Sequence, residues 1–362
     1  MELEAKHGHQ CARAKTSSGL MGIADLLGDV PLGSTPQATT GALSDAFMEK
    51  FPAYDGIMVY RFAADDSGEV VHESVRPESG VASSYLNLRF PATDIPPKAR
   101  ELLRLTGVRF IADTSAPGVP VDIFHERVQV VDLSKSALRA SSECHLSFLR
   151  NMGVKSSLVV AIIVDAKLWG LYSFHSYTKV VIPSCEERIM IEMAATITSS
   201  LVLHFQQEDL VTTNLSLSRS LVNFRKHTHV HSFLSVEYKT LLSILDIDTI
   251  VLSQAGQPDA IVYGNSDVSL TSEECKELLK KPVSDHTVMF TSLEMRGVAF
   301  FSVRSFVVAF VRGAVARHVR WAGKSDTPLH DQEMDHPRAS FDLFIETAGA
   351  EFDRGRRLPS TC

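Results

Sequence analysis

The sequence predicts an α+β fold with two α/β-sandwich domains joined by one long helix. Strand patterns paired by short turns, mixed with helical stretches, occur over residues 54–175 and again over residues 249–311. Between them, residues 184–227 contain no Gly or Pro, and apolar residues recur at helical spacing. The 362 residues, 44% of them apolar and 22% charged, suffice for two domains of ordinary size.

The first domain is expected to follow a loose arm over residues 1–38, which is rich in Gly, Ser, Thr and Lys and has one short helix over 20–27. In chain order its predicted elements are a helix (41–51), a hairpin (54–62 with 69–74), a helix (97–105), a strand (108–111) and a second hairpin (157–164 with 168–175). Alternation along the last strand would place Trp169, Leu171, Ser173 and His175 on one face. These strands predict one sheet with helices on its faces.

The long helix would reach ~60 Å at a rise of about 1.5 Å per residue. A helix of this length joins domains and often pairs with a partner chain. The alternative is two helices with a break near Thr212 and Thr213. The second domain is expected to contain five strands and one helix: 249–253, 260–263, 287–290, 297–303 and 306–311, with the helix over 272–281. The polar stretch that follows has no periodicity, as in a functional excursion.

Charge and cysteine usage exclude several functional classes. A formal net charge of -7 argues against nucleic acid or an anionic membrane as the main partner. Five scattered cysteines without a CxxC pair predict no disulfide framework and no metal site, and favour a reducing compartment. The acidic N-terminus lacks a secretory core, and the apolar runs 157–164 and 297–315 are too short or interrupted by arginine. A cytoplasmic protein is expected, or a nuclear one in a eukaryote.

Cys144 is the first candidate for chemistry. It follows Arg139 by five residues, precedes His145 and begins an amphipathic stretch. Neighbouring cationic groups favour the thiolate, which is the form that adds to electrophiles. The alternative interpretation is a buried cysteine of the core.

Four motifs extend this observation. Residues 90–96 (FPATDIP), 138–146 (LRASSECHL), 168–171 (LWGL, with His175) and 337–341 (PRASF) occur in this order. In order and spacing they closely resemble the phytochromes, red/far-red photoreceptors that carry a covalent linear tetrapyrrole, or bilin. The resemblance covers about residues 40–345. It implies the following organisation: a GAF domain over 39–205, a connecting helix over 186–227, a PHY domain over 228–350 with a hairpin tongue over about 318–345, and a tail over 351–362.

Two departures from the family pattern affect these expectations. Too few residues precede Tyr54 for the PAS domain with which phytochromes usually start, so a PAS-less, knotless member or a fragment is expected. The sequence also contains no kinase motif, so we expect no enzyme activity beyond autocatalytic attachment of the pigment.

The resemblance implies a set of bilin-contacting residues. They are Tyr60, Phe90, Asp94, Ile95, Pro96, Arg109, Arg139, Cys144, His145, Phe148, Ser157 and His175. Cys144 would be the thioether anchor, and Arg109 and Arg139 would bind the two propionates. The histidines would manage pigment protonation and bond the ring D carbonyl, and the aromatic residues would form a cage around ring D. From the tongue, Pro337, Arg338 and Phe341 would close the site, with Arg338 paired to Asp94.

Simpler roles stay open for several of these residues. Asp94 could be the N-cap of the following helix, the arginines could be solvated, and the histidines and aromatic residues could be ordinary core residues.

The position of the anchor also implies the pigment. Family members that bind biliverdin use an N-terminal cysteine, whereas a cysteine at position 144 resembles users of phycocyanobilin or phytochromobilin, one per chain. Cys11 lacks the surrounding motif. The implied mechanism is isomerisation between rings C and D, loss of the Asp94–Arg338 contact and refolding of the tongue, with a homodimer formed through the connecting helix and an unknown downstream partner. Other classes considered are a cysteine-dependent enzyme, a GAF sensor of cyclic nucleotides, and a bilin-free dimerisation scaffold.

Overall fold

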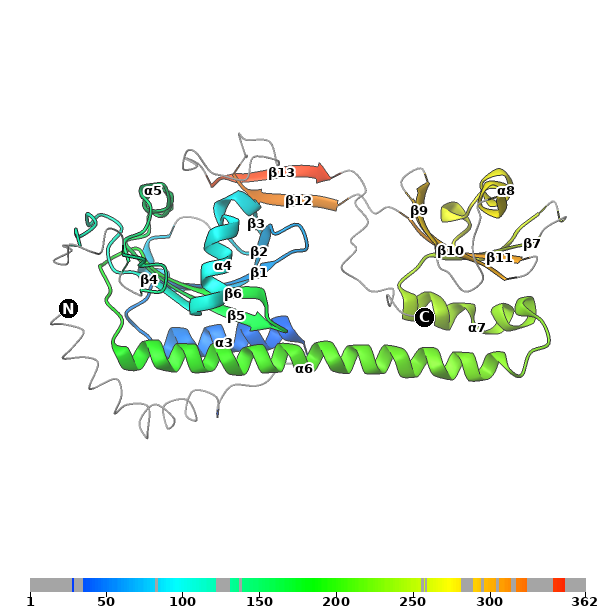
Figure 1. Cartoon of the computed structure of the whole chain (residues 1–362), viewed down its shortest axis with the longest axis horizontal. Coiled ribbons are helices and arrows are strands. Elements are labelled where there is room, and N and C mark those ends of the chain that lie inside the picture. The colour runs from blue at the N-terminus through cyan, green and yellow to red at the C-terminus, as the bar shows by residue number, and fades with distance from the viewer. Residues whose placement is uncertain are drawn as a thin grey trace. The chain divides into compact units, whose positions relative to one another are not determined.

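The computed structural model describes most of the chain between residues 35 and 348 (Figure 1). The described residues are 28, 35–81, 84–121, 131–136, 139–254, 257, 259–280, 289–293, 296–303, 306–313, 317–323 and 341–348. The chain divides into two compact units, residues 1–206 with 319–346 and residues 207–318 with 347–362. Each unit has its own sheet with helices on it, so the predicted α+β class is confirmed.

The first unit contains an eight-stranded sheet in the order β13-β12-β3-β2-β1-β6-β5-β4. Its helices and strands are α3 (Pro36–Lys50), β1 (Gly56–Phe62), β2 (Gly68–Val75), η1 (Pro77–Ser79), β3 (Arg89–Phe90), η2 (Ala92–Asp94), α4 (Pro97–Thr106), β4 (Val108–Ile111), α5 (Glu143–Asn151), β5 (Ser156–Val164), β6 (Lys167–Ser176), the first part of α6 (Cys185–Phe224), β12 (Arg317–Ala322) and β13 (Leu343–Ala348). Both predicted hairpins form, as antiparallel pairs β1–β2 and β5–β6.

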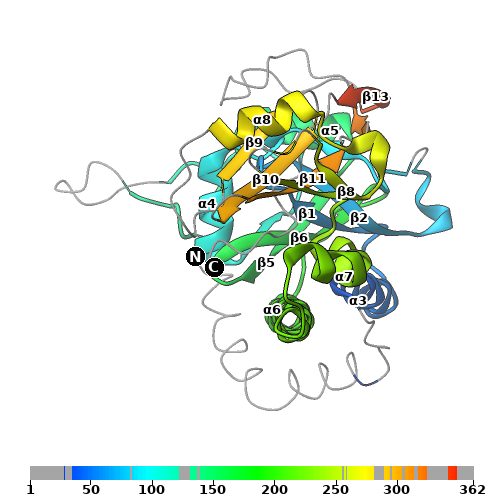
Figure 2. The same cartoon turned by 90° about the vertical axis from the view of Figure 1, so that its right-hand side faces the viewer.

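The sheet separates two apolar cores. On one face, α3 and the N-terminal part of α6 cover the central strands (Figures 1 and 2). Side chains such as Phe47, Ile191 and Tyr172 are fully buried there, as alternation along a half-covered strand requires. On the opposite face, α4 and α5 lie over the sheet, and a second core forms there around Tyr60, Phe90 and other residues. This second face carries the candidate site.

A β-bulge in β6 changes the predicted alternation. Ile162 pairs with Gly170 and Ile163 pairs with Leu168, so Trp169 between them has no partner on β5. The extra residue turns the Trp169 side chain to the α3–α6 face, where it packs on the first core. The expectation that Trp169 shares a face with Leu171, Ser173 and His175 is therefore wrong for Trp169.

Two strands from late in the sequence join the first unit. β12 pairs in parallel with β3, with Trp321 opposite Arg89, and β13 lies beside β12. The two are tied to each other because Trp321 Nε1 donates to Glu346 Oε2 at 2.8 Å and Gly323 N donates to the Asp342 carbonyl at 2.7 Å. These strands occupy the two ends of the predicted tongue. The tip of the predicted tongue, with Pro337 and Arg338, lies outside the described residues.

The second unit contains a five-stranded sheet in the order β8-β7-β11-β10-β9. Its elements are α7 (Val230–Leu245), β7 (Thr249–Gln254), β8 (Ile261–Gly264), η3 (Ser266–Val268), α8 (Ser272–Lys280), β9 (Met289–Leu293), β10 (Arg296–Val303) and β11 (Phe306–Gly313). The sequence did not predict α7, whose Phe233 and Leu234 are buried against Ile250 and Leu252 of β7. The end of α6 is held to α7 by a hydrogen bond from Asn223 Nδ2 to Glu237 at 2.9 Å.

Helix α6 runs without interruption for 40 residues, so there is no break at Thr212 and Thr213. By length and composition it is also, among the described helices, the one candidate for a membrane span. Ile191, Ala194 and Val202 are nevertheless fully buried against the first unit's sheet. Because core helices of soluble proteins have this same composition, the apolar content of α6 is weak evidence for a membrane.

Candidate functional site

The predicted site residues come from seven elements that meet on the second face of the first unit's sheet. The core on this face contains Tyr60 of β1, Phe90 of β3, Phe148 of α5 and Ile95 after η2. Ser157 of β5 pairs with His175 of β6, so both side chains point to the same face. The structure thus brings together residues that are up to about a hundred positions apart in the sequence.

Helix α5 presents Cys144 in its first turn. Ser142 is the N-cap, and its hydroxyl accepts a hydrogen bond from His145 N at 3.3 Å. Cys144 is half-buried two residues later. The unpaired N–H groups and the dipole at a helix N-terminus favour a negative charge, so this position favours the thiolate form of a cysteine.

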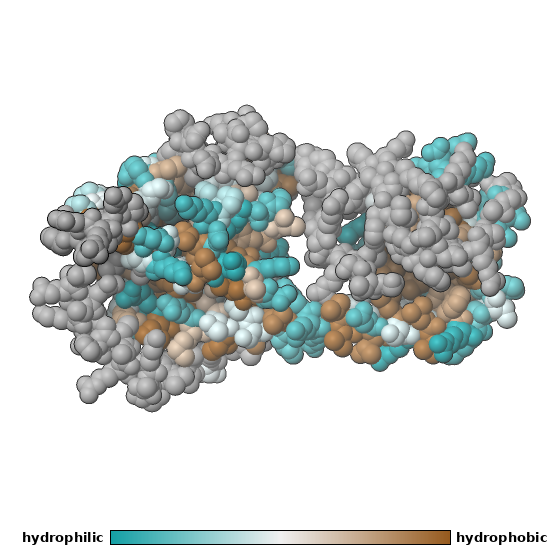
Figure 3. All heavy atoms as spheres, viewed as in Figure 1, coloured by the Kyte–Doolittle hydropathy of each residue, from teal (hydrophilic) through white to brown (hydrophobic). Residues whose placement is uncertain are grey.

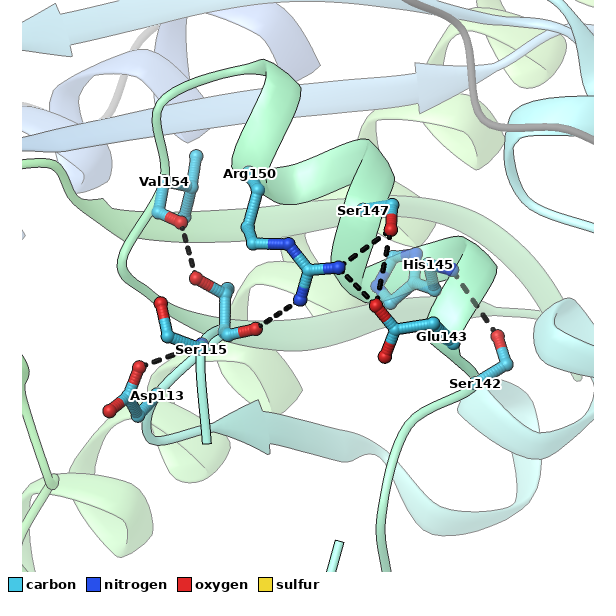
Figure 4. Close-up of polar contacts among 9 residues, drawn as sticks. Asp113, Ser115, Ser142, Glu143, His145, Ser147, Arg150 and Val154 are labelled. Carbon is cyan, nitrogen blue, oxygen red and sulfur yellow. Dashed lines mark hydrogen bonds and ion pairs between the residues drawn. The ribbon is translucent and has the colours of Figure 1, made fainter. Parts of the chain in front are cut away.

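Arg150 fixes the orientation of this helix. Figure 4 shows its guanidinium between α5 and the segment of residues 113–115. Nη1 donates to the Thr114 carbonyl at 2.7 Å, and Nη2 donates to Ser147 Oγ at 2.6 Å and pairs with Glu143. Glu143 is also an acidic residue in the first turn, where it is favourable to the helix dipole. Arg150 therefore ties the helix carrying Cys144 to the segment of residues 113–115 and links the first turn of the helix to its last.

Buried His175 of β6 lies near half-buried His145 of α5. Burial, with a contribution from nearby Arg109, lowers the pKa of His145 from its ordinary 6.5 to about 4. Burial, with a contribution from His145, lowers the pKa of His175 to about 4 as well. Both imidazoles are therefore neutral near pH 7. The ring of His145 stacks on Phe148, with centroids 6.2 Å apart and an interplanar angle of 12°.

Each nitrogen of the His175 ring has a hydroxyl near it. Nε2 lies 3.3 Å from Ser173 Oγ, and Nδ1 lies 3.4 Å from the Tyr177 hydroxyl. Sequence analysis did not select Tyr177, because the residue lies just beyond the predicted strand.

Two arginines lie side by side next to His145. Nη2 of Arg109 donates to the Arg139 carbonyl at 2.6 Å and to Ser141 Oγ at 2.8 Å, and Arg139 Nη1 donates to the Ser136 carbonyl at 3.2 Å. Burial and the neighbouring Arg139 lower the pKa of Arg109 to about 10. Two partly buried guanidinium groups in this arrangement favour binding of anionic groups such as carboxylates.

Asp94 is buried within the short helix η2. The alternative role as a helix N-cap is wrong, because α4 begins after Pro96 and has no side-chain cap. Arg100 of α4 holds the backbone on both sides of Asp94, since Nη1 donates to the Ala92 carbonyl at 3.1 Å and to the Ile95 carbonyl at 2.6 Å. Its Nη2 donates to Asp66 Oδ2 at 2.8 Å. Arg100 thus links the Asp94 turn to the β1–β2 turn.

Substitution of Arg100 with alanine is expected to lower the free energy of unfolding of the first unit by about 2–3 kcal/mol, because charge-assisted bonds to two backbone carbonyls and to Asp66 are lost. Arg104→Ala, which removes an exposed arginine from the same helix, is the matched control. Urea unfolding followed by tryptophan fluorescence measures this unit selectively, because Trp169 and Trp321 both belong to it. Equal midpoints for the two variants would contradict this role of Arg100.

Aromatic side chains pack against one another in the core of the site face. Phe341, at the start of the β13 arm, lies edge-on to Phe148 with centroids 5.0 Å apart and tilted to Phe90 at 6.4 Å. Tyr60 lies 6.0 Å from Phe90. The structure adds Tyr85, which is 5.8 Å from Phe90 and is held by a bond from its backbone N to Glu73 Oε2 at 3.0 Å. Sequence analysis missed Tyr85 because it lies in a loop without periodicity.

Comparison with known proteins identifies the family. The GAF domain model matches residues 47–201. The chain is 30% identical over 343 residues to cyanobacterial phytochrome B of Nostoc sp., covering 86% of this chain and 44% of that protein. It is 39% identical over 164 residues to a bacteriophytochrome of Pseudomonas aeruginosa, covering 44% of this chain and 22% of that protein. The chain is a GAF–PHY region of the phytochrome family.

Two solved structures share this fold. A crystal structure of a bacteriophytochrome from R. palustris matches this phytochrome chain with a TM-score of 0.74 and 20% identity, over 94% of this chain and 72% of that one. The phytochrome photosensory core module of Stigmatella aurantiaca matches with a TM-score of 0.71 and 25% identity, over 92% and 69%. The phytochrome chain spans less than half the length of the two curated relatives named above.

Proposed function

We propose that this chain is a red/far-red light photoreceptor that binds one linear tetrapyrrole covalently through Cys144. One observation carries the proposal: Arg109 is hydrogen-bonded to Arg139 and Ser141 directly before the helix N-terminus that presents Cys144 and His145, and His175 lies on the same face of the GAF sheet. A thiol, an anion site and neutral imidazoles suit the pyrrole rings, propionates and reactive side chain of a bilin. The aromatic residues around them suit its flat, apolar surface.

Each side chain of the site has its own role in binding the pigment. The guanidinium groups of Arg109 and Arg139 bind the two propionates. The thiol of Cys144 adds across the ethylidene double bond of ring A, so that a carbon–sulfur bond forms and the thiol proton goes to the neighbouring carbon. The neutral imidazoles of His145 and His175 exchange hydrogen bonds with the pyrrole and carbonyl groups.

Asp94 and the aromatic residues complete the site in this proposal. The backbone carbonyl of Asp94, next to Ile95 and Pro96, would accept hydrogen bonds from the pyrrole N–H groups. Tyr60, Phe90 and Phe148 exclude water from the ring D end, and Ser157 lies on the same face of the sheet. When bound, the pigment supplies absorption of visible light and isomerisation of a double bond.

The β12 and β13 arms are placed to respond to changes in the site. Phe341 contacts Phe90 and Phe148, and Ala322 is fully buried in the same core. A rearrangement of the aromatic residues would therefore change the packing of these arms directly. We propose that light alters this contact and that α6 transmits the change.

Phycocyanobilin or phytochromobilin is the proposed pigment, because the thiol is in the GAF domain at α5. The test is co-expression of the chain with a phycocyanobilin pathway, followed by absorption spectra after alternating red and far-red light. We expect a coloured protein with a reversible red/far-red difference spectrum. A colourless protein would contradict the proposal and would favour a nucleotide-sensing GAF domain or a pigment-free scaffold. A second sample loaded with biliverdin measures the preference of the chain between pigments.

We further propose that the chain forms a homodimer through α6. Val211 and Leu215 lie one turn apart on this helix and are 56% and 53% exposed. Figure 3 shows apolar residues along the visible surface of α6. A paired helix would remove these side chains from water.

Val211→Glu combined with Leu215→Glu is expected to convert the dimer to a monomer, because two buried carboxylates would oppose helix pairing. Sedimentation velocity measures the change. Thr212→Glu, at an exposed polar position of the same turn, is the matched control and should remain dimeric. A monomeric wild type, or a double variant that stays dimeric, would contradict this interface.

A further inference from the structure

Tyr177 lies against His175, two residues beyond it and just after the end of β6. The two rings meet edge to face, with centroids 6.0 Å apart and an interplanar angle of 89°. The Tyr177 hydroxyl lies 3.4 Å from Nδ1 of His175. Tyr177 also packs against the core on the site face of the sheet. The contact therefore joins the candidate site to the turn that follows its last strand.

Two neighbours place the tyrosine ring there. Gly56 is the cross-strand partner of His175 on β1, and a Cβ built on Gly56 would lie 3.4 Å from Cε2 of Tyr177. Gly56 therefore lines the space next to His175 that the Tyr177 ring occupies, at ordinary contact distance.

Asp55 holds the backbone of the turn. Its buried carboxylate accepts hydrogen bonds from Tyr177 N at 2.7 Å, Thr178 N at 2.8 Å and Ser176 Oγ at 3.1 Å. Burial alone would raise the pKa of Asp55, but these bonds lower it below its ordinary value, so the carboxylate remains an acceptor. Asp55 N also donates to the His175 carbonyl at 2.9 Å, which ties the same residue to the end of β6.

The direction of the Tyr177–His175 bond follows from the phenol. Among the residues that the structure describes, the Tyr177 hydroxyl has one hydrogen-bond partner, Nδ1 of His175. Tyr177 is half-buried, and its hydroxyl proton needs an acceptor. Burial, with Tyr85, Glu73 and Asp55 nearby, raises the pKa of Tyr177, so the phenol keeps its proton. With the phenol as the donor, Nδ1 carries a lone pair, and the single proton of the neutral ring lies on Nε2, beside Ser173 Oγ at 3.3 Å.

We propose that Tyr177 is a positioning residue that fixes His175 in the Nε2–H tautomer. The ring then presents a hydrogen-bond donor, rather than an acceptor, on the site face of β6. A ligand carbonyl is the group that this donor fits. The tautomer itself depends only on residues of this chain, whereas the identity of the carbonyl as that of a bilin rests on the proposed function.

The test is the imidazole ¹H–¹⁵N spectrum of the pigment-free chain labelled with ¹⁵N-histidine. His175→Gln identifies the His175 signals by their loss. In the wild type near pH 7.5 we expect a neutral ring protonated on Nε2. In Tyr177→Phe, which keeps the ring and removes the hydroxyl, the preference for this tautomer should fall about two- to tenfold, as expected for one buried hydrogen bond.

Tyr172→Phe is the matched control. It removes a buried hydroxyl from β6, the strand that carries His175. This hydroxyl lies on the opposite face of the sheet, 3.2 Å from Thr198 Oγ1. This variant should leave the His175 spectrum unchanged. A wild-type ring protonated on Nδ1, or a Tyr177→Phe spectrum identical to the wild type, would overturn the proposal.

Pigment-loaded protein gives a second, separate readout. Tyr177→Phe should shift the absorption band, whereas Tyr172→Phe should not. If the chain binds no pigment while the tautomer result holds, the proposed function fails and the role of Tyr177 stands. If pigment binds but Tyr177→Phe leaves the tautomer unchanged, the proposed function stands and the role of Tyr177 fails.

Discussion

Replacing Cys144 with alanine is expected to abolish covalent attachment of a bilin while leaving the chain folded. The thiol is the group that would form the bond, and α5 keeps its other supports, the Ser142 cap and the Arg150 contacts. Because Cys144 is only half-buried, its truncation should cost about 1 kcal/mol of stability or less. The measurement is zinc-enhanced fluorescence of the denatured protein on a gel after co-expression with the pigment pathway.

Cys275→Ala provides the control for this experiment. Cys275 is buried in the core of the second unit and is not part of the site. This variant should retain the fluorescent band at the wild-type level. A band that survives in Cys144→Ala would show that a different nucleophile carries the pigment.

Acidification is expected to destabilise the pigment-free first unit through His145 and His175. Both have a folded pKa of about 4, below the ordinary value of 6.5 that applies in the unfolded chain. Between these values the unfolded state binds more protons than the folded state, so stability falls as the pH decreases. The loss begins below about pH 6.5 and stops growing below about pH 4. At about 1.4 kcal/mol per pKa unit, each histidine should remove about 2 kcal/mol by pH 5.

Urea unfolding at pH 7.5 and pH 5.0, followed by tryptophan fluorescence, measures this effect in the first unit. His145→Gln and His175→Gln should each reduce the acid-dependent loss by about 2 kcal/mol, because a glutamine does not titrate. His204→Gln, at an exposed position of α6, should show the wild-type dependence on pH. If the histidine variants lose as much stability on acidification as the wild type, the burial of these two rings in the pigment-free protein is contradicted.

Local patterns predicted most of the fold. The apolar strands β1 and β5, the turns that follow them and the Gly- and Pro-free α6 all have strong local signals, and the structure has each of them. Two features depend on non-local contacts and were not predictable in this way. They are the bulge that turns Trp169 to the opposite core and the parallel pairing of Trp321 with Arg89. Helix α7 was missed although its apolar residues, among them Val230, Phe233, Leu234, Leu241 and Leu245, recur at helical spacing.

The sequence predicted the residues that would contact the pigment better than it predicted the residues that hold them in place. The implied site residues Tyr60, Phe90 and Phe148 share one core, and Arg109, His145 and His175 are neighbours. The roles assigned to these residues remain proposals.

The residues that hold the site in place have no sequence pattern as strong as the motifs of the site itself. Tyr85 and Tyr177 lie outside the predicted helices and strands, and Arg100 and Arg150 act through bonds to carbonyls that only the folded backbone brings within reach. Such contacts follow from tertiary structure, since neither periodicity nor composition encodes which carbonyl lies near which arginine.

Peptide mapping of the pigment-loaded chain tests the central claim most directly. Trypsin cleavage after Arg139 and Arg150 releases residues 140–150, which contain Cys144 and no other cysteine. We predict that mass spectrometry finds one bilin on this peptide, bonded at Cys144. A bilin found instead on the peptide with Cys11, or on no peptide at all, would contradict the account.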